Sequence, residues 1–160
     1  MKNIQEEKIK RIRSWMNINN LNAYIVPHDD EYMSEYLPPQ NERLDWLTGF
    51  NGSAGIAIIT LDTAAIFIDG RYTVQVTTQV DTNIFQIKHL INDPYLKWIE
   101  STIGNNSVVG FDPKLHTKNW LKKSNQILDD TIILKPIEEN PIDSLWKKKP
   151  IKKINRPVLL

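Results

Sequence analysis

The residues Asp69, Gly70, Arg71 and Tyr72 form the local group with the clearest chemical potential in this sequence. They follow an apolar run at residues 64–68 that predicts a buried strand, so Gly70 would turn the chain at the edge of a sheet. Open α/β sheets bind ligands at such carboxyl ends. The planar guanidinium of Arg71 suits a carboxylate or a peptide carbonyl. The pattern therefore indicates either a binding role for Arg71 or a surface ion pair with Asp69.

A glycine-rich turn precedes that strand, with Gly49, Gly52 and Gly55 at a spacing of three. A phosphate cradle is one interpretation, but phosphate loops lie between a strand and a helix. Here the next residues, 56–60, are apolar and β-branched, which predicts a strand. The spacing favours a structural turn over a nucleotide site.

The loop that begins His28-Asp29-Asp30-Glu31 could ligate a metal ion. Adjacent side chains rarely converge on one ion, and no second cluster supports them, so a solvated loop is the competing interpretation. His89 and His116 stand alone in the sequence, and Ser53 does not lie in a nucleophile elbow. We expect no catalytic residue and no metal ligand within this chain.

Strand patterns alternate with helix patterns along the chain, which predicts a layered α/β domain. The runs 56–60 and 64–68 predict adjacent strands joined by a tight turn, which makes the sheet mixed. About six strands and four helices fit the length. The expected strands cover 23–27, 56–60, 64–68, 84–90, 107–111 and 131–134. The expected helices include 3–17, 42–47, 72–80, a helix that begins at Asp93-Pro94 with Asp93 as N-cap, and 117–128 with Thr117 as cap.

The bulk composition narrows the function classes. The chain has 160 residues and no Cys, which excludes disulfides, a thiolate nucleophile and a Cys-type zinc site. Neither a signal peptide nor a membrane-spanning run is visible, so a cytoplasmic location is expected, with no membrane partner. Residues 1–146 carry 14 basic and 19 acidic side chains, which argues against nucleic-acid binding.

The last part of the chain has a different character. Prolines recur from Pro136 onward, and six Lys or Arg with no acid lie in 147–160. The basic run at 147–153 could be a nuclear-import or polyanion patch, or a solvated linker. The expected organisation is one domain at 1–135 and a Pro/Lys-rich linker at 136–160 that leads toward a further domain.

Several segments together resemble the N-terminal domain of Xaa-Pro aminopeptidases (aminopeptidase P), the creatinase/prolidase N-terminal domain. The resemblance covers nearly the whole chain in order and is most similar to the long, three-domain, cytosolic type. It is carried by Ala-Tyr-Ile-Val-Pro at 23–27, Ser-Glu-Tyr at 34–36, the segment from Trp46 to Thr60, Ile-Asp-Gly-Arg-Tyr at 68–72, Val-Val-Gly-Phe-Asp-Pro at 108–113 and Glu-Asn-Pro-Ile-Asp-Ser-Leu-Trp at 139–146.

The resemblance implies a three-layer fold with a mixed, about six-stranded sheet flanked by helices and a ribonuclease H-like motif. It implies a parent enzyme that removes an N-terminal residue preceding proline. In that family two Asp, one His and two Glu of a C-terminal domain hold two divalent ions, usually manganese, and none of that domain is in this sequence. Of the family's functional residues only one can be carried over: Arg71, which would contact bound peptide from its own chain or from a partner in a homodimer.

Two hypotheses stay open. The chain could be an accessory domain that shapes the cleft of such an enzyme, inactive alone and in contact with the remaining domains of the same chain. Alternatively, it could be a stand-alone, non-catalytic module that binds peptides or proteins.

Overall fold

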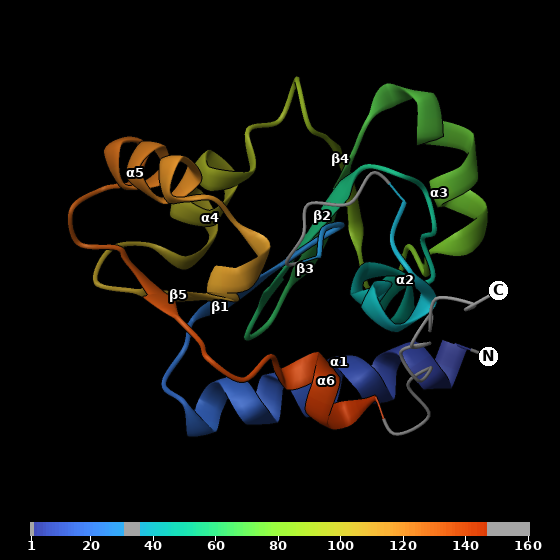
Figure 1. Cartoon of the computed structure of the whole chain (residues 1–160), viewed down its shortest axis with the longest axis horizontal. Helices are drawn as coiled ribbons and strands as arrows, with labels where there is room; N and C mark the ends of the chain where they lie inside the picture. Colours follow the sequence, from blue (N-terminus) through green and yellow to red (C-terminus); the bar gives the residue numbers. More distant parts are fainter. Residues whose placement is uncertain (1, 31–35, 147–160) are drawn as a thin grey trace, which may run out of the picture.

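The computed structural model describes residues 2–30 and 36–146. Six strands form one sheet in the order β4-β3-β2-β1-β5-β6 (Figure 1). The strands are β1 Ala23–Pro27, β2 Gly55–Thr60, β3 Ala64–Ile68, β4 Gln86–His89, β5 Val108–Phe111 and β6 Ile133–Pro136. The prediction of a mixed, six-stranded α/β fold is confirmed.

The strand directions decide which loops share an edge of the sheet. β2 runs antiparallel to both β1 and β3, whereas the other pairings, β1 with β5, β5 with β6 and β3 with β4, are parallel. Five strands therefore point the same way, and their carboxyl ends lie at one edge together with the amino end of β2. This carboxyl edge brings together the segments after β1 and β3 and the segment before β2.

Alternating side chains bury both faces of the central strands. In β3, Ile66 packs into one apolar cluster with α1 and α2, and Phe67 packs into a second cluster with α4. Both side chains are fully buried, as expected for strands covered on two faces. β2 and β3 form the predicted pair of adjacent strands, with Ile58 opposite Ala65.

Helices cover both faces of the sheet (Figure 1). The helices are α1 Lys2–Ile18, α2 Arg43–Thr48, α3 Thr73–Gln79, α4 Tyr95–Ile103, α5 Lys118–Ile127 and α6 Pro141–Leu145. Side chains of α1, α2, α3 and α6 contribute to one cluster. Those of α4 contribute to the other, and Trp120 and Leu121 of α5 pack against it. Short 3-10 turns cover Pro39–Asn41, Gly70–Tyr72 and Pro113–Leu115.

Three local predictions need correction. Asp93 does not cap α4, because its Oδ2 accepts the backbone N–H of His89 (3.0 Å) and the helix begins at Tyr95 after Pro94. β4 is shorter than 84–90, because the backbone N–H groups of Ile84 and Phe85 turn back to the carbonyl of Asp81. The structure also has more helices than the four expected.

Part of the predicted linker packs against the domain. Ile142 of α6 is fully buried in the cluster that contains α1. The side chain of Asn140 caps α6 by accepting the N–H of Ile142 (3.0 Å). Residues 147–160, with the basic run at 147–153, lie outside the described residues, as does Glu31, so those expectations stay predictions.

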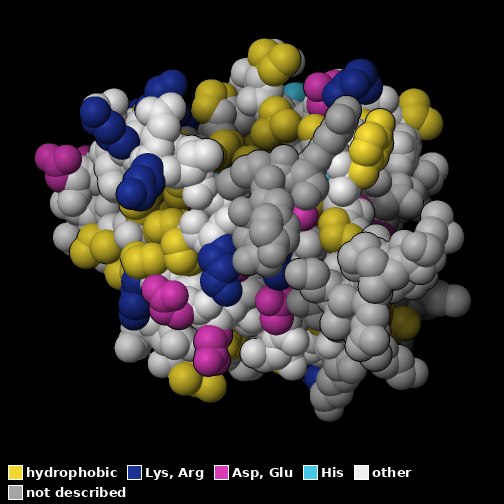
Figure 2. All heavy atoms as spheres, in the orientation of Figure 1, with side chains coloured by type: hydrophobic (Ala, Val, Ile, Leu, Met, Phe, Trp, Pro, Cys, Tyr) yellow, Lys and Arg dark blue, Asp and Glu magenta, His cyan; other side chains and the backbone are white. Residues whose placement is uncertain are grey.

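No helix in the described ranges is long and apolar enough to cross a membrane. Figure 2 shows Lys and Arg side chains on one face, several of them over α5, interspersed with apolar side chains and, elsewhere, with Asp and Glu. The described part of this face carries no continuous basic surface.

Candidate functional site

The candidate site lies at the carboxyl edge of the sheet, where β3 passes into the 3-10 turn Gly70–Tyr72. Asp69 begins this turn: its Oδ1 accepts the backbone N–H of Arg71 (2.9 Å) and the Nε–H of the same residue (3.2 Å). The backbone hydrogen bond from Arg71 is the main reason why the pKa of Asp69 lies below its usual value. The carboxylate thus fixes the turn and one side of the guanidinium.

Arg71 is the exposed member of the group, with 70% of its side chain accessible. Within the described ranges the side chain of Arg71 makes one hydrogen bond, through its Nε–H, so the donors of the two Nη groups stay available. The predicted ion pair with Asp69 therefore exists. It occupies the Nε–H of Arg71 and leaves the Nη groups available to bind an anion or a carbonyl.

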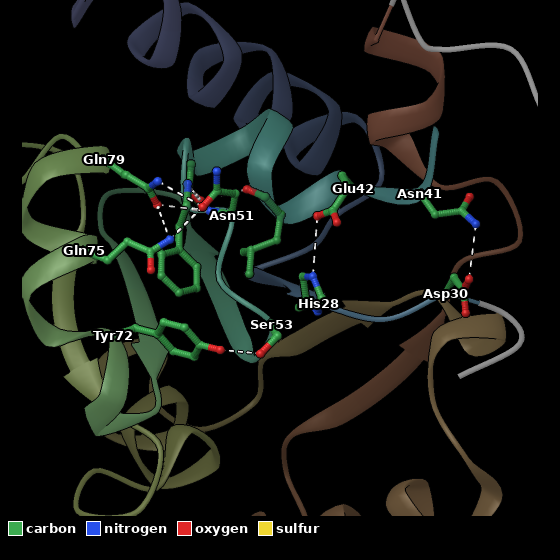
Figure 3. Close-up of polar contacts among 12 residues, drawn as sticks. His28, Asp30, Asn41, Glu42, Asn51, Ser53, Tyr72, Gln75 and Gln79 are labelled. Carbon is green, nitrogen blue, oxygen red and sulfur yellow. Dashed lines mark hydrogen bonds and ion pairs between the residues drawn. The ribbon is translucent and has the colours of Figure 1, made fainter. Parts of the chain in front are cut away.

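Tyr72 lies between Arg71 and the glycine-rich turn at residues 49–55, which we call the glycine loop. Its hydroxyl is hydrogen-bonded to the hydroxyl of Ser53, and the two side chains point toward one another (Figure 3). Its ring packs edge-on against Phe50 (5.5 Å between centroids), and the Arg71 guanidinium lies 5.4 Å from its centroid. The hydrogen bond from Ser53 lowers the pKa of the Tyr72 phenol. Of the two aromatic neighbours, Phe50 is a core residue and Tyr72 is half-buried beside Arg71.

The glycine loop is a structural turn that runs from α2 into β2. Gly49 has a φ of 85°, a left-handed conformation that ends α2 and sends its N–H to the carbonyl of Asp45 (2.7 Å). Gly52 covers the Phe50 ring so closely that a Cβ would lie 2.2 Å from Phe50 Cζ. The loop enters a strand rather than a helix, so it lacks the helix N-terminus that a phosphate loop uses.

Three amide side chains join the loop to α3, and the sequence analysis missed them. Asn51 Oδ1 accepts hydrogen bonds from Gln75 Nε2 (2.6 Å) and Gln79 Nε2 (2.9 Å), and Gln79 Oε1 accepts the Asn51 backbone N–H (3.2 Å) (Figure 3). The sequence does contain a signal for them. Arg71, Gln75 and Gln79 are spaced four residues apart, which places them on one face of a helical segment. We call Asn51, Gln75 and Gln79 the amide seam.

The acidic loop after β1 does not form a metal centre within the described residues. His28 Nε2 faces Glu42 Oε2 at 3.4 Å, and Asp30 accepts a hydrogen bond from Asn41 Nδ2 (3.3 Å) (Figure 3). No group of three or more His, Asp or Glu side chains in the described ranges is placed to hold a metal ion. The described residues do not fit a two-metal ligand set, so no metal-dependent step is assigned to them.

The two other histidines take different positions. His89 is the last residue of β4 and pairs with Ile68 of β3, so it lies at the carboxyl edge, one strand from Asp69. His116 stacks on Trp120 with 3.8 Å between ring centroids, and burial lowers its pKa to about 4. Both have structural positions, in a strand and in an aromatic stack.

A groove of about 560 Å³ lies on the other side of α2. Trp46 and Trp146 stack in its wall (6.1 Å between centroids), and Lys8 Nζ lies 4.5 Å above the Trp46 ring. Asn51 also lines it, so the loop separates this groove from Arg71.

Comparisons with known proteins agree with this architecture. The family model of the Creatinase/Prolidase N-terminal domain matches residues 8–145. The chain is 34% identical over 148 residues to human Xaa-Pro aminopeptidase 2, covering 92% of this chain and 22% of that protein. It is 34% identical over 143 residues to a probable Xaa-Pro aminopeptidase P of Colletotrichum graminicola, covering 87% of this chain and 23% of that protein.

Among solved structures, the cytosolic X-prolyl aminopeptidase of Caenorhabditis elegans, which has a di-nuclear active site, superposes with a TM-score of 0.84 at 28% identity. The match covers 92% of this chain and 26% of that one. The N-terminal domain of a Corynebacterium diphtheriae metallopeptidase shares the fold, with a TM-score of 0.63 at 20% identity, covering 84% of this chain and 96% of that one. The chain thus spans about a quarter of the length of these Xaa-Pro aminopeptidase relatives. The mixed six-stranded sheet and the Asp69–Tyr72 turn agree with the match over residues 8–145. This chain belongs to the creatinase/prolidase N-terminal domain family, in the form found in Xaa-Pro aminopeptidases.

Proposed function

We propose that this chain is the accessory N-terminal domain of a metal-dependent Xaa-Pro aminopeptidase, and that Arg71 helps to position the peptide. The parent enzyme would remove an N-terminal residue preceding proline. Catalysis would belong to a separate domain that holds two divalent ions, for which manganese is the expected metal. Residues 136–160 would lead toward the remaining domains, in a cytoplasmic protein that can form a homodimer.

The observation that carries this proposal is the presentation of Arg71. Its turn is fixed by Asp69, its side chain is 70% accessible, and its hydrogen bond to that carboxylate uses Nε rather than an Nη group. A guanidinium held in this way can donate two parallel hydrogen bonds to a carboxylate, or donate to peptide carbonyls. Holding the peptide in register lowers the entropic part of the barrier without any contact to the reacting atoms.

The test compares Arg71→Ala with Arg11→Ala in the full-length protein that contains this chain. Arg11 is a matched control, because it is also exposed and pairs through Nε with a carboxylate at 3.2 Å, that of Glu7. Loss of a charged hydrogen bond should lower kcat/KM on X-Pro peptides by roughly tenfold to a hundredfold for Arg71→Ala. Arg11→Ala should stay within about twofold of wild type.

A folded Arg71→Ala enzyme with unchanged kcat/KM on several X-Pro peptides would rule out the positioning role. The 160-residue chain alone, assayed with added manganese, should leave X-Pro peptides intact. Turnover by the pure chain would overturn the accessory role. Tight binding of peptide by the isolated chain would instead favour a stand-alone binding module.

A further inference from the structure

We infer that Gln79 is a positioning residue for Arg71, acting through the glycine loop; this inference rests on the function proposed above. Gln79 occupies the last turn of α3, two helical turns after Arg71. It does not lie at the sheet edge itself. Its effect would reach Arg71 through Asn51, Ser53 and Tyr72.

The first step is the contact between Gln79 and Asn51. One carboxamide makes two complementary hydrogen bonds: Oε1 accepts the backbone N–H of Asn51 (3.2 Å) and Nε2 donates to Asn51 Oδ1 (2.9 Å). Gln75 Nε2 donates to the same Oδ1 (2.6 Å) and to Gln79 Oε1 (3.2 Å). Both the backbone and the side chain of Asn51 are therefore held by α3.

The second step is that the start of the loop also rests on this end of α3. The missing Cβ of Gly49 would lie 2.6 Å from the backbone carbonyl oxygen of Gln79. Gln5 of α1 joins the same two segments: its Nε2 donates to the Thr48 carbonyl (2.8 Å), and its Oε1 accepts the Asp81 N–H (3.3 Å). The loop thus has little freedom to shift at Gly49 or Asn51 while these contacts persist.

The third step connects the loop to Arg71. Two residues after Asn51, Ser53 binds the hydroxyl of Tyr72, whose ring lies beside the Arg71 guanidinium. The loop is therefore attached to both ends of the segment 71–79, by Tyr72 near the start and by Gln79 at the end. If the attachment at Gln79 is lost, Ser53 can move, and with it the surface on which Arg71 lies.

These contacts predict a functional effect larger than their contribution to stability. Exposed neutral hydrogen bonds contribute little to folding, because water replaces them when they break. A small displacement of Arg71 can nevertheless weaken its hydrogen bonds to bound peptide, because these bonds depend steeply on distance and angle. A residue with a merely structural role would lower the melting temperature without this selective effect.

The experiment measures kcat, KM and the melting temperature of the full-length protein. Gln79→Ala should raise KM for an X-Pro peptide by about tenfold and change kcat by less than about twofold. Gln126→Ala is the matched control, because Gln126 is an exposed glutamine of a helix, α5, with no side-chain hydrogen bond in the described ranges. It should leave KM within about twofold of wild type.

The decisive variant is the double mutant Arg71→Ala/Gln79→Ala. If Gln79 acts through Arg71, adding Gln79→Ala should cause no further loss once Arg71 is gone. An undiminished effect in that background, or a wild-type KM for Gln79→Ala, overturns the inference while the role of Arg71 stands. If Arg71→Ala itself has no effect, the proposed function fails and the inference fails with it.

A second measurement does not depend on activity. In the 160-residue chain, hydrogen exchange of the Asn51 amide should become faster in Gln79→Ala, because that N–H loses its acceptor, and should be unchanged in Gln126→Ala. Asn51→Ala, which removes Oδ1 but keeps the N–H, should give a smaller rise in KM than Gln79→Ala. Equal exchange of Asn51 in wild type and Gln79→Ala overturns the inference at its first step.

Discussion

Arg43 and Asp143, which are 100 residues apart in the sequence, are joined by two parallel hydrogen bonds. Arg43 Nε lies 2.8 Å from Asp143 Oδ1, and Arg43 Nη2 lies 3.1 Å from Asp143 Oδ2. The Arg43 side chain is 10% exposed, so the cation depends on this carboxylate. The contact ties α6 to the start of α2, the helix that leads into the glycine loop.

Removal of that carboxylate should destabilise the fold. Asp143→Ala would leave the Arg43 cation buried without this partner, and we expect the free energy of unfolding to fall by about 2 kcal/mol, less than for a fully buried pair because Asp143 is partly exposed. Urea denaturation of the chain measures this loss. Asp130→Ala, at an exposed carboxylate, should have no measurable effect. Equal stabilities of the Asp143 and Asp130 variants would show that the contact contributes nothing.

Truncation tests where the domain ends. A chain that ends at residue 135 lacks Ile142, which is fully buried, and also lacks the partner of Arg43. We expect it to be less stable than a chain that ends at residue 146, by about 3 kcal/mol or more. Denaturation midpoints of the two chains provide the comparison. Coincident midpoints would support the boundary at 135 and make α6 dispensable.

Glycine is required at position 52 for steric reasons. A Cβ there would lie 2.2 Å from Phe50 Cζ, and the Phe50 ring is fully buried and cannot move away freely. Gly52→Val should therefore lower the free energy of unfolding by about 2–3 kcal/mol. Gly55→Val should also destabilise, because its Cβ would lie 3.1 Å from a Leu44 methyl.

Gly70 provides the control for both substitutions, because no heavy atom lies within 4 Å of the Cβ that alanine would add. Gly70→Ala should change the stability by less than about 0.5 kcal/mol. Melting temperatures of Gly52→Val and Gly55→Val that match wild type would contradict the steric argument.

Local patterns were sufficient to predict most of the fold. The β-branched runs at 56–60 and 64–68 specify the hairpin because both faces of these strands are buried, and Thr117 caps α5 as its position predicts. The parallel neighbours of β1 and β3 could not be read from the sequence, because strand order depends on contacts between distant segments. α6 was missed because it is only five residues long and owes its order to packing and to Arg43.

The candidate site was predictable only in part. The position of Arg71 after a buried strand was enough to predict that its side chain is exposed at the edge of the sheet. The amide seam was not predicted, because glutamines have no distinctive signal and their partner, Asn51, comes from a loop whose path depends on the Gly49 and Gly52 conformations. In the acidic loop at 28–30, His28 pairs with Glu42 and Asp30 accepts a hydrogen bond from Asn41. These contacts could not be predicted, because they depend on segments that the tertiary fold brings together.

His28 should make the fold more stable below neutral pH than above it. The hydrogen bond with Glu42 is the main cause of its raised pKa, with Asp29 also favouring the cation, whereas burial opposes these effects. A raised pKa in the folded state means that the stabilisation is complete below the unfolded value of about 6.5 and is lost as pH rises through the folded value. The urea concentration at the unfolding midpoint of wild type should therefore decrease as the pH rises from 6 to 8.

Two variants isolate that contribution. His28→Gln removes the titrating group, and Glu42→Gln removes the carboxylate that favours its protonation. Both should show a smaller change in midpoint between pH 6 and pH 8 than wild type. A wild-type pH dependence in His28→Gln would assign the effect to another group.

The contribution of His116 to stability should change with pH in the opposite direction to that of His28. The two histidines are therefore controls for each other. The His116 ring contacts both Phe111 and Trp120, its Nε2 is buried without a partner in the described ranges, and burial lowers its pKa to about 4. The neutral form is therefore favoured in the folded state, so its stabilisation is complete above about pH 6.5 and is lost as pH falls toward 4. By linkage the loss amounts to about 3 kcal/mol at most.

The measurement is the difference in free energy of unfolding between wild type and His116→Phe from pH 7 to pH 4. Carboxylates titrate in the same window, but they titrate in both proteins and cancel in the difference. The phenylalanine keeps the aromatic stack and removes the ionisable nitrogens, so wild type should lose stability relative to the variant as pH falls. Parallel curves would mean that His116 is as easily protonated in the folded chain as in the unfolded one, and a direct titration of its ring protons by NMR would then place its pKa near 6.5 rather than near 4.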